Sequence, residues 1–213
     1  MADAKTLKSR LASGEFDARL KEVYLSDKAV EDQKKRDAVI IDEFVRLFGD
    51  NESIELFSAP GRTEVGGNHT DHNHGKVLAA SVDLDTVAAA AKRDDGIIVE
   101  KSFKFDALEV DISDLKVHTE EFGKSSGLIR GMCAGFKERG YNIGGFNAAS
   151  MSRVLSGSGL SSSAAYEVLI GTILNHLYND GKVSPVEVAK IAQYAENKYF
   201  GKPCGLLDQT ASS

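Results

Sequence analysis

Apolar residues recur every three or four positions between residues 27 and 49, which predicts a long amphipathic helix. Its apolar side would consist of Val39, Ile40, Phe44, Leu47 and Phe48. Asp27 is expected to cap this helix, and Gly49 is expected to end it. Residues 1–50 are therefore expected to be helical.

The middle of the chain changes to short apolar runs separated by polar turns, which is the pattern of β-strands. The expected strands are Ile54–Ser58, Val77–Asp83, Thr86–Lys92, Ile97–Lys101 and Phe103–Val110. Pro60 and Gly61 are expected to end the first strand. The polar stretch that follows, as far as Gly75, is expected to be a functional loop.

Helical spacing returns in the last ninety residues of the chain. The expected elements are a helix over Ser125–Arg139, a strand over Phe146–Leu155, a buried helix from about Leu160 to Tyr178, and a helix from Pro185, capped by Ser184, to about Phe200. Early strands followed by late helices favour an α+β fold over a doubly wound parallel one.

The composition is that of a globular protein, with 42% hydrophobic and 27% charged residues among 213. A formal net charge of −6 argues against a binder of nucleic acid or of anionic membranes. Cys133 and Cys204 lack zinc or redox spacing and are expected to be reduced thiols of a cytoplasmic protein. We find no signal peptide and no apolar stretch long enough for a membrane helix.

The segment GSGLSSSAA, residues 157–165, stands between a predicted strand and a predicted buried helix. Its glycines let the backbone approach a phosphate, and the first N–H groups of the helix favour an anion. Its serines add hydroxyl donors and a candidate Mg²⁺ ligand. It is not a Walker loop, because no Gly-Lys-Ser/Thr follows the glycines. The alternative is an ordinary Gly/Ser turn before a core helix.

The segment APGRTEVGGNHTDHNHG, residues 59–75, gathers polar side chains that include Arg62. In an extended segment His69 and Asp71 face the same way and could bracket sugar hydroxyls. One alternative is a solvated polar turn. Another is a metal site made of three histidines and one aspartate, against which His72 and His74 are expected to point away from the other two.

The segment AENKYFGKPCGLLDQ, residues 195–209, carries two candidate acids. Asp208 follows a tight turn at Pro203–Gly205, which would hold its carboxylate at a helix start. Glu196 shares a helical face with small residues, which suggests a carboxylate buried to hold a cation. The alternatives are an ordinary acid in a first helical turn and a solvated Glu196.

Together the three motifs resemble the galactokinase branch of the GHMP small-molecule kinases. The family signatures are G-R-x-N-x-x-G-E-H-T-D-Y-N, G-G-G-L-S-S-S-A and P-C-G-x-M-D-Q, and this chain has GRTEVGGNHTDHN, GSGLSSSA and PCGLLDQ. The resemblance spans about residues 54–213. It implies an α+β N-terminal domain like domain 2 of ribosomal protein S5, with the family's C-terminal ferredoxin-like domain absent or truncated.

The resemblance also implies a division of the chain. A helical segment would occupy residues 1–50, and the GHMP kinase N-terminal domain with its ATP-binding loop would occupy residues 51–200. Residues 201–213 would begin the helix of the catalytic aspartate. The chain is accordingly expected to be an N-terminal fragment that cannot turn over alone.

Roles follow residue by residue from the resemblance. Asp208 is implied as the catalytic aspartate, and Arg62 beside it would keep it ionised. The sugar site is implied to contain Asn68, His69, Asp71 and Gly205. The ATP loop is implied to consist of Gly157, Ser158, Gly159, Leu160, Ser161, Ser162, Ser163 and Ala164. The Mg²⁺ ligands are implied to be Ser162 and Glu196.

The implied activity is ATP-dependent phosphorylation of galactose at its C1 hydroxyl, with ATP and Mg²⁺, in a cytoplasmic monomer. Three positions depart from the first family signature: Asn68 replaces Glu, His72 replaces Tyr, and Glu64 replaces Asn. The amide of Asn68 removes a charge-assisted hydrogen bond worth about 1.5–3 kcal/mol. Another sugar, such as N-acetylgalactosamine or arabinose, therefore stays open. So do a non-catalytic sensor of sugar and ATP, and a metal-dependent hydrolase.

Overall fold

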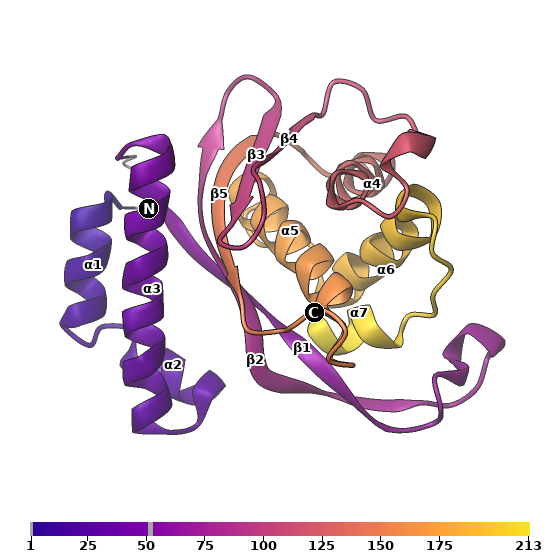
Figure 1. Cartoon of the computed structure of the whole chain (residues 1–213), viewed down its shortest axis with the longest axis horizontal. Helices are drawn as coiled ribbons and strands as arrows, with labels where there is room; N and C mark the ends of the chain where they lie inside the picture. The colour runs from indigo at the N-terminus through magenta and orange to yellow at the C-terminus, as the bar shows by residue number, and fades with distance from the viewer. Residues whose placement is uncertain (1, 51–52) are drawn as a thin grey trace.

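The computed structural model describes residues 2–50 and 53–213, which form three layers with one sheet between two groups of helices (Figure 1). On one side lie α1 (Ala4–Ala12), α2 (Asp17–Tyr24) and α3 (Asp27–Phe48). On the other side lie α4 (Ser125–Glu138), α5 (Ser162–Asn179), α6 (Pro185–Ala195) and α7 (Leu207–Ser212). The predicted α+β class is confirmed. The boundary expected between the helical segment and the kinase domain falls at residues 50 and 51. Residues 51 and 52 lie outside the described residues.

The sheet is mixed, with the strand order β1-β2-β5-β3-β4. Its strands are β1 (Glu55–Gly66), β2 (Leu78–Arg93), β3 (Ile97–Ser102), β4 (Leu108–Asp111) and β5 (Gly145–Ser152). Neighbours are antiparallel except β3 and β5, which are parallel. Short 3₁₀ turns occur at η1 (Thr70–Asn73) and η2 (Thr119–Glu121). β4 is shorter than the strand expected over Phe103–Val110.

The hairpin of β1 and β2 is longer than the sequence predicts. β1 does not end at Pro60-Gly61 but continues to Gly66, and the two strands expected between residues 77 and 92 form one strand. Proline is tolerated here because β1 is an edge strand. The register shifts between Pro60 and Arg62, as at a β-bulge. The hairpin therefore extends beyond the sheet and carries η1 at its tip (Figure 1).

Helix ends are set by local capping. Ser184 caps α6 as predicted, and its hydroxyl accepts the N–H of Glu187. In α3 the cap is Ser26 rather than Asp27, since the Ser26 hydroxyl accepts the N–H of Ala29 at 3.2 Å. α6 ends one turn earlier than predicted, and a π-helical turn, η3 (Glu196–Phe200), completes the segment. Within the described residues, no helix has the length and apolar character needed to cross a membrane.

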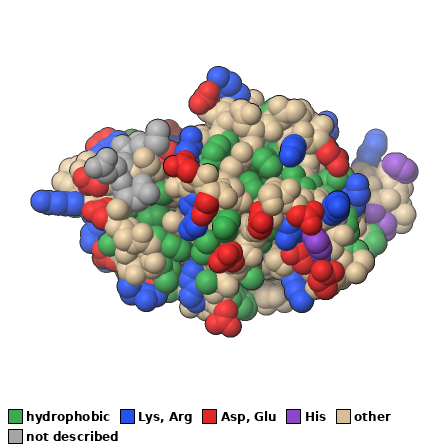
Figure 2. Space-filling view, turned by 90° about the horizontal axis from the view of Figure 1, so that it is seen from above, with side chains coloured by type: hydrophobic (Ala, Val, Ile, Leu, Met, Phe, Trp, Pro, Cys, Tyr) green, Lys and Arg blue, Asp and Glu red, His purple; other side chains and the backbone are tan. Residues whose placement is uncertain are grey.

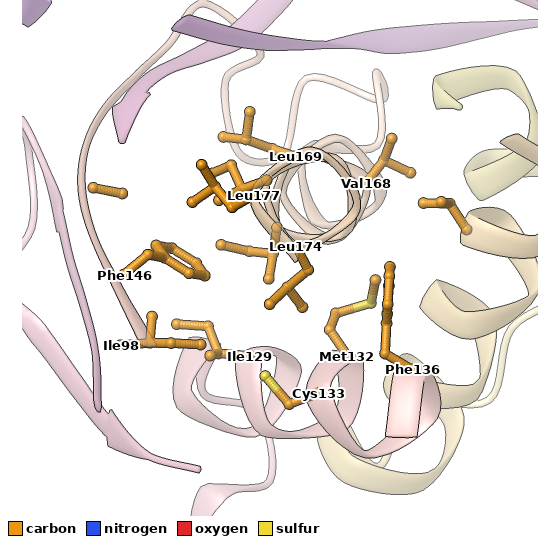
Figure 3. Packing of buried hydrophobic residues seen from close by; sticks show 14 of the residues in the cluster. Ile98, Ile129, Met132, Cys133, Phe136, Phe146, Val168, Leu169, Leu174 and Leu177 are labelled. Carbon is orange, nitrogen blue, oxygen red and sulfur yellow. The ribbon is translucent and has the colours of Figure 1, made fainter. Parts of the chain in front are cut away.

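Apolar side chains fill both sides of the sheet. One cluster lies between the sheet and α4, α5 and α6, where Met132 and Phe136 face the side chains of α5 (Figure 3). The other lies between the sheet and α1 and α3 and includes Phe44. β2 serves both, since alternate residues point to opposite faces. Its members are Ala88 and Ala90 in the first cluster, and Val87, Ala89 and Ala91 in the second.

A buried polar network joins α3 to β2. The side chains of Arg36 and Asp85 form an ion pair in which each is 3% exposed. Tyr24 donates its hydroxyl hydrogen bond to the same carboxylate. Beside this pair, Gln33 donates to Asp37 at 2.6 Å. Burial raises the pKa of Asp37 to about 7.

Because the native state binds a proton on Asp37 more tightly than the unfolded chain does, this group reduces stability as the pH rises. The contribution of Asp37 to the free energy of unfolding falls by up to about 1.4 kcal/mol per pH unit. This fall occurs between the unfolded-state pKa of 3.8 and the native-state pKa of about 7. We predict that Asp37→Asn and wild type have equal free energies of unfolding near pH 4. At pH 8 the variant should be more stable.

Urea unfolding at pH 4.5, 6 and 8 measures this difference. Asp42→Asn is the matched control, because Asp42 lies on the exposed side of the same helix. Parallel pH profiles for Asp37→Asn and wild type would contradict the prediction.

Candidate active site

Arg62 connects the hairpin, the Gly/Ser loop and α7. Its side chain is buried, and Nε donates to Oδ1 of Asp208 at 2.7 Å. Nη1 donates to the carbonyl oxygen of Gly159 at 2.6 Å, and the Arg62 backbone N–H donates to that of Leu160 at 3.1 Å. Gly61 permits this approach, because a Cβ there would lie 2.9 Å from the Leu160 carbonyl oxygen. The structure therefore brings together Arg62, Asp208 and the loop.

Asp208 lies in the first turn of α7 with both carboxylate oxygens engaged. Oδ1 accepts from Arg62, and Oδ2 accepts from the hydroxyl of Ser161. Ser161 stands at the start of α5 but makes no side-chain capping bond to that helix, since its hydroxyl is directed to Asp208. The carboxylate is thus fixed in orientation while its side chain stays 25% exposed.

The Gly/Ser loop takes a backbone path that suits its sequence. β5 ends three residues before the predicted Leu155, so the loop is longer than expected. Gly157 and Gly159 have φ angles of 77° and 78°, which glycine adopts without strain. Ser161 is also left-handed, with φ of 54°. The loop leads directly into α5, whose first N–H groups have no partner within the helix.

The turn at the hairpin tip differs from the extended segment that the sequence analysis assumed. His69 is left-handed, with φ of 50°, and η1 follows it as a 3₁₀ turn. The Nε2 atom of His69 lies 3.1 Å from Nη2 of Arg62. Oδ2 of Asp71 accepts the N–H of Leu207 at 2.8 Å. The two side chains line one cavity, but separate partners hold them there.

Asp71 packs against the turn that precedes α7. Partial burial acts to raise the pKa of Asp71, but the backbone N–H groups of Leu207 and Leu206 outweigh it and hold this pKa below its usual range. A Cβ at Gly205 would lie only 1.9 Å from Oδ2 of Asp71. Glycine is therefore required at position 205 for this contact.

Glu64, to which the sequence analysis assigned no role, positions His69. Its Oε1 accepts the backbone N–H of His69 at 3.0 Å, and its Oε2 lies 3.4 Å from Nε2 of the ring. A signal for this was present in the sequence. Glu64 is two residues from Arg62, so the two share one side of β1.

Two buried acids flank a glutamine beneath the loop. Glu167 and Gln209 are 0% exposed and Glu196 is 2% exposed. Nε2 of Gln209 donates to Glu196 at 2.7 Å and to Glu167 at 3.2 Å. Burial, and then repulsion from Glu196, raises the pKa of Glu167 well above its usual range. Glu196 is itself buried, so the solvated alternative for it is wrong.

Glu167 and Gln209 were not predicted as site residues from the sequence. The available signal for Glu167 was an acid within an otherwise apolar helical stretch. Gln209 carried no such signal. It adjoins Asp208 in the sequence, and that position is not evidence of a buried contact. Their pairing joins α5 to α7 across 42 positions of sequence, which no local pattern shows.

The residues predicted to hold Mg²⁺ lie around this cluster. Ser162 lines the cavity as the first residue of α5. The hydroxyl that contacts Glu196, however, is that of Ser163, which donates to Oε1 at 3.3 Å. Nζ of Lys202 lies 3.3 Å from the same oxygen. Carboxylate and hydroxyl oxygens are the ligands that Mg²⁺ prefers, so the donor set fits this ion in its chemistry.

The histidine-rich turn does not form the alternative metal site. In the part of the chain that the structure describes, no group of three or more His, Cys, Asp or Glu side chains is placed to hold a metal. His72 was expected to point away from His69 and Asp71, but it lines the same cavity. Figure 2 shows histidine side chains at the end of the molecule that carries η1.

An open cavity of about 600 Å³ joins these groups, a volume typical of small-molecule sites. The residues predicted for catalysis or sugar binding that line this cavity are Arg62, His69, Asp71, Gly205 and Asp208. The residues of the predicted ATP loop that line it are Gly157, Gly159, Ser161, Ser162 and Ser163. The predicted residues outside its lining are Asn68, Ser158, Leu160, Ala164 and Glu196.

Two family models match the chain. The galactokinase galactose-binding signature matches residues 42–92, and the GHMP kinases N terminal domain matches residues 127–213. The first contains Arg62 and η1, and the second contains the Gly/Ser loop and Asp208. The resemblance to the galactokinase branch of the GHMP kinases is confirmed.

Curated relatives of the chain include galactokinases. That of Bacillus subtilis (strain 168) is 35% identical over 172 residues, which are 79% of this chain and 43% of that protein. That of Clostridium beijerinckii is 37% identical over 178 residues, which are 81% of this chain and 44% of that protein. The chain therefore spans less than half the length of the curated relatives it matches.

Solved structures share the fold. The crystal structure of Lactococcus lactis galactokinase complexed with galactose matches with a TM-score of 0.75 and 34% identity. The match covers 82% of this chain and 45% of that one. The Methanococcus jannaschii mevalonate kinase matches with a TM-score of 0.63 at 16% identity, covering 75% of this chain and 51% of that one, and it shares the fold alone.

We predict that Gly205→Ala destabilises the chain by about 1–3 kcal/mol, because the new methyl group must displace the Asp71 carboxylate. Urea unfolding measures the loss. Gly66→Ala is the control, since a Cβ there has no neighbour within 4 Å and its φ is not left-handed. Equal stability of the two variants would contradict the proposed close packing.

Proposed function

Because the chain carries the galactokinase galactose-binding signature and the N-terminal domain of the GHMP kinases, we propose that it is part of a sugar kinase. The reaction would transfer the γ-phosphoryl group of ATP to the C1 hydroxyl of galactose. The observation that carries this proposal is the Arg62–Asp208 pair held against the Gly/Ser loop in one cavity. Phosphoryl transfer depends mainly on positioning and charge neutralisation, and these groups can supply both.

The loop and the start of α5 would bind the nucleotide phosphates. Gly157 and Gly159 have no heavy atom within 4 Å of a built Cβ, so a phosphate can approach their backbone closely. Ser162 and Ser163 line the same cavity. Glu196 with a serine hydroxyl would hold Mg²⁺, which when bound neutralises phosphate charge. Residues 51–200 would form the nucleotide-binding domain, as the sequence predicts.

The acceptor sugar would lie between η1 and the turn before α7. His69 and Asp71 would contact its hydroxyls from one side, and Gly205 would leave room on the other. The C1 hydroxyl would take the place of Ser161 as the donor to Oδ2 of Asp208. Asp208 would then accept the proton or orient the hydroxyl, while Arg62 keeps the carboxylate fixed.

A panel of galactose, N-acetylgalactosamine and arabinose with ATP and Mg²⁺ tests the substrate. The assay should use this chain and the longest reading frame that contains it, because the chain spans less than half of its curated relatives. We expect galactose phosphorylation by the longer protein and none by the 213 residues alone. Binding of galactose and ATP without turnover by the longer protein would favour a sensor instead.

We predict that Asp208→Asn lowers kcat of the longer protein by at least about 10²-fold, since an amide accepts no proton. Galactose affinity, measured by equilibrium dialysis, should change little. A coupled assay for ADP release measures turnover. Turnover at the wild-type rate would rule out the catalytic assignment.

A further inference from the structure

Lys202 stands between the cavity and the buried Glu196. Its Nζ lies 3.3 Å from Oε1 of Glu196, and the Ser163 hydroxyl donates to that same oxygen at 3.3 Å. Lys202 and Ser163 both line the cavity, whereas the buried Glu196 does not. An ammonium group and a hydroxyl therefore already contact the carboxylate oxygen that an ion from the cavity would bind.

The charges around Glu196 make this contact important. Gln209, which donates to Glu196, is neutral. Arg62, another basic residue of the cavity, is already bound to Asp208. In the described part of the chain, Lys202 is the basic side chain that pairs with Glu196. The Lys202 side chain is 62% exposed, so water screens the pair and the ammonium can move away.

We propose that Lys202 is a built-in counter-cation of Glu196 and competes with a divalent cation for Oε1. This inference rests on the proposed function, which makes Glu196 a ligand of Mg²⁺. A divalent ion that binds Oε1 must first displace the ammonium. Lys202 therefore weakens cation binding and sets the concentration at which the site fills.

A lysine beside a phosphate-binding loop has a second common role, which is to contact phosphate directly as a point charge. The two roles predict opposite effects on the metal. Removing a competitor tightens cation binding in the absence of nucleotide. Removing a phosphate contact leaves that binding unchanged and weakens only the nucleotide.

The test is a titration of the 213-residue chain with Mn²⁺ in the absence of nucleotide, followed by electron paramagnetic resonance of the free ion. Lys202→Met removes the charge but keeps an unbranched apolar side chain. We expect its Kd for Mn²⁺ to fall about 1.5- to fivefold, the range for a partly exposed ion pair. Lys202→Arg should retain the wild-type Kd.

Lys198→Met is the matched control, because Nζ of Lys198 lies 3.2 Å from the Tyr194 hydroxyl and is not paired with Glu196. It should leave the Mn²⁺ Kd unchanged. Circular dichroism checks that each variant is folded. An unchanged or weaker Mn²⁺ affinity in folded Lys202→Met, or no measurable binding to either protein, overturns the inference.

Glu196→Gln separates this inference from the metal role on which it rests. If Glu196→Gln abolishes Mn²⁺ binding while Lys202→Met does not tighten it, Glu196 is a ligand and only the competition fails. If Glu196→Gln binds Mn²⁺ as wild type does, the ligand role of Glu196 fails and the competition fails with it.

Discussion

The candidate site depends on the ion pair between Arg62 and Asp208, which joins residues 146 positions apart in sequence. The guanidinium group distributes its donors in a fixed plane. Nε binds Asp208, Nη1 binds the Gly159 carbonyl, and Nη2 lies beside His69. One buried side chain therefore aligns a helix, a loop and a turn. A lysine could not do this, because its ammonium is a single point of charge.

The sheet gives Arg62 a rigid base. β2 is buried on both faces over residues 87–91, where small side chains let helices pack closely from either side. The same strand continues outward as the exposed half of the hairpin that carries η1. The register shift after Pro60 marks the change from core to site. Any movement of the hairpin would therefore pivot at the edge of a tightly packed sheet.

The sequence was informative where structure depends on local pattern. The α+β class and the helices follow from the spacing and type of residues, and they were predicted. The signature motifs could be read directly from the sequence. The extension of β1 through Pro60 was not, because proline is tolerated only once the strand is known to lie at an edge. The contacts of Glu167 and Gln209 were missed because their partners are fixed by tertiary packing. That of Glu64 was missed because the strand was expected to end before this residue. The 3₁₀ turn after His69 was missed because Asp71 is held there by α7.

The contact between Gly205 and Asp71 constrains how this site can evolve. A side chain at position 205 and a carboxylate at position 71 cannot occupy the same space, since a Cβ would lie 1.9 Å from Oδ2. The two positions are therefore epistatic. Replacing Gly205 is easier after the side chain at position 71 has been shortened, and the two orders of substitution pass through different intermediates. Asp71 also accepts the hydrogen bond of the Leu207 N–H. The order of substitution that removes the carboxylate first therefore also weakens the start of α7.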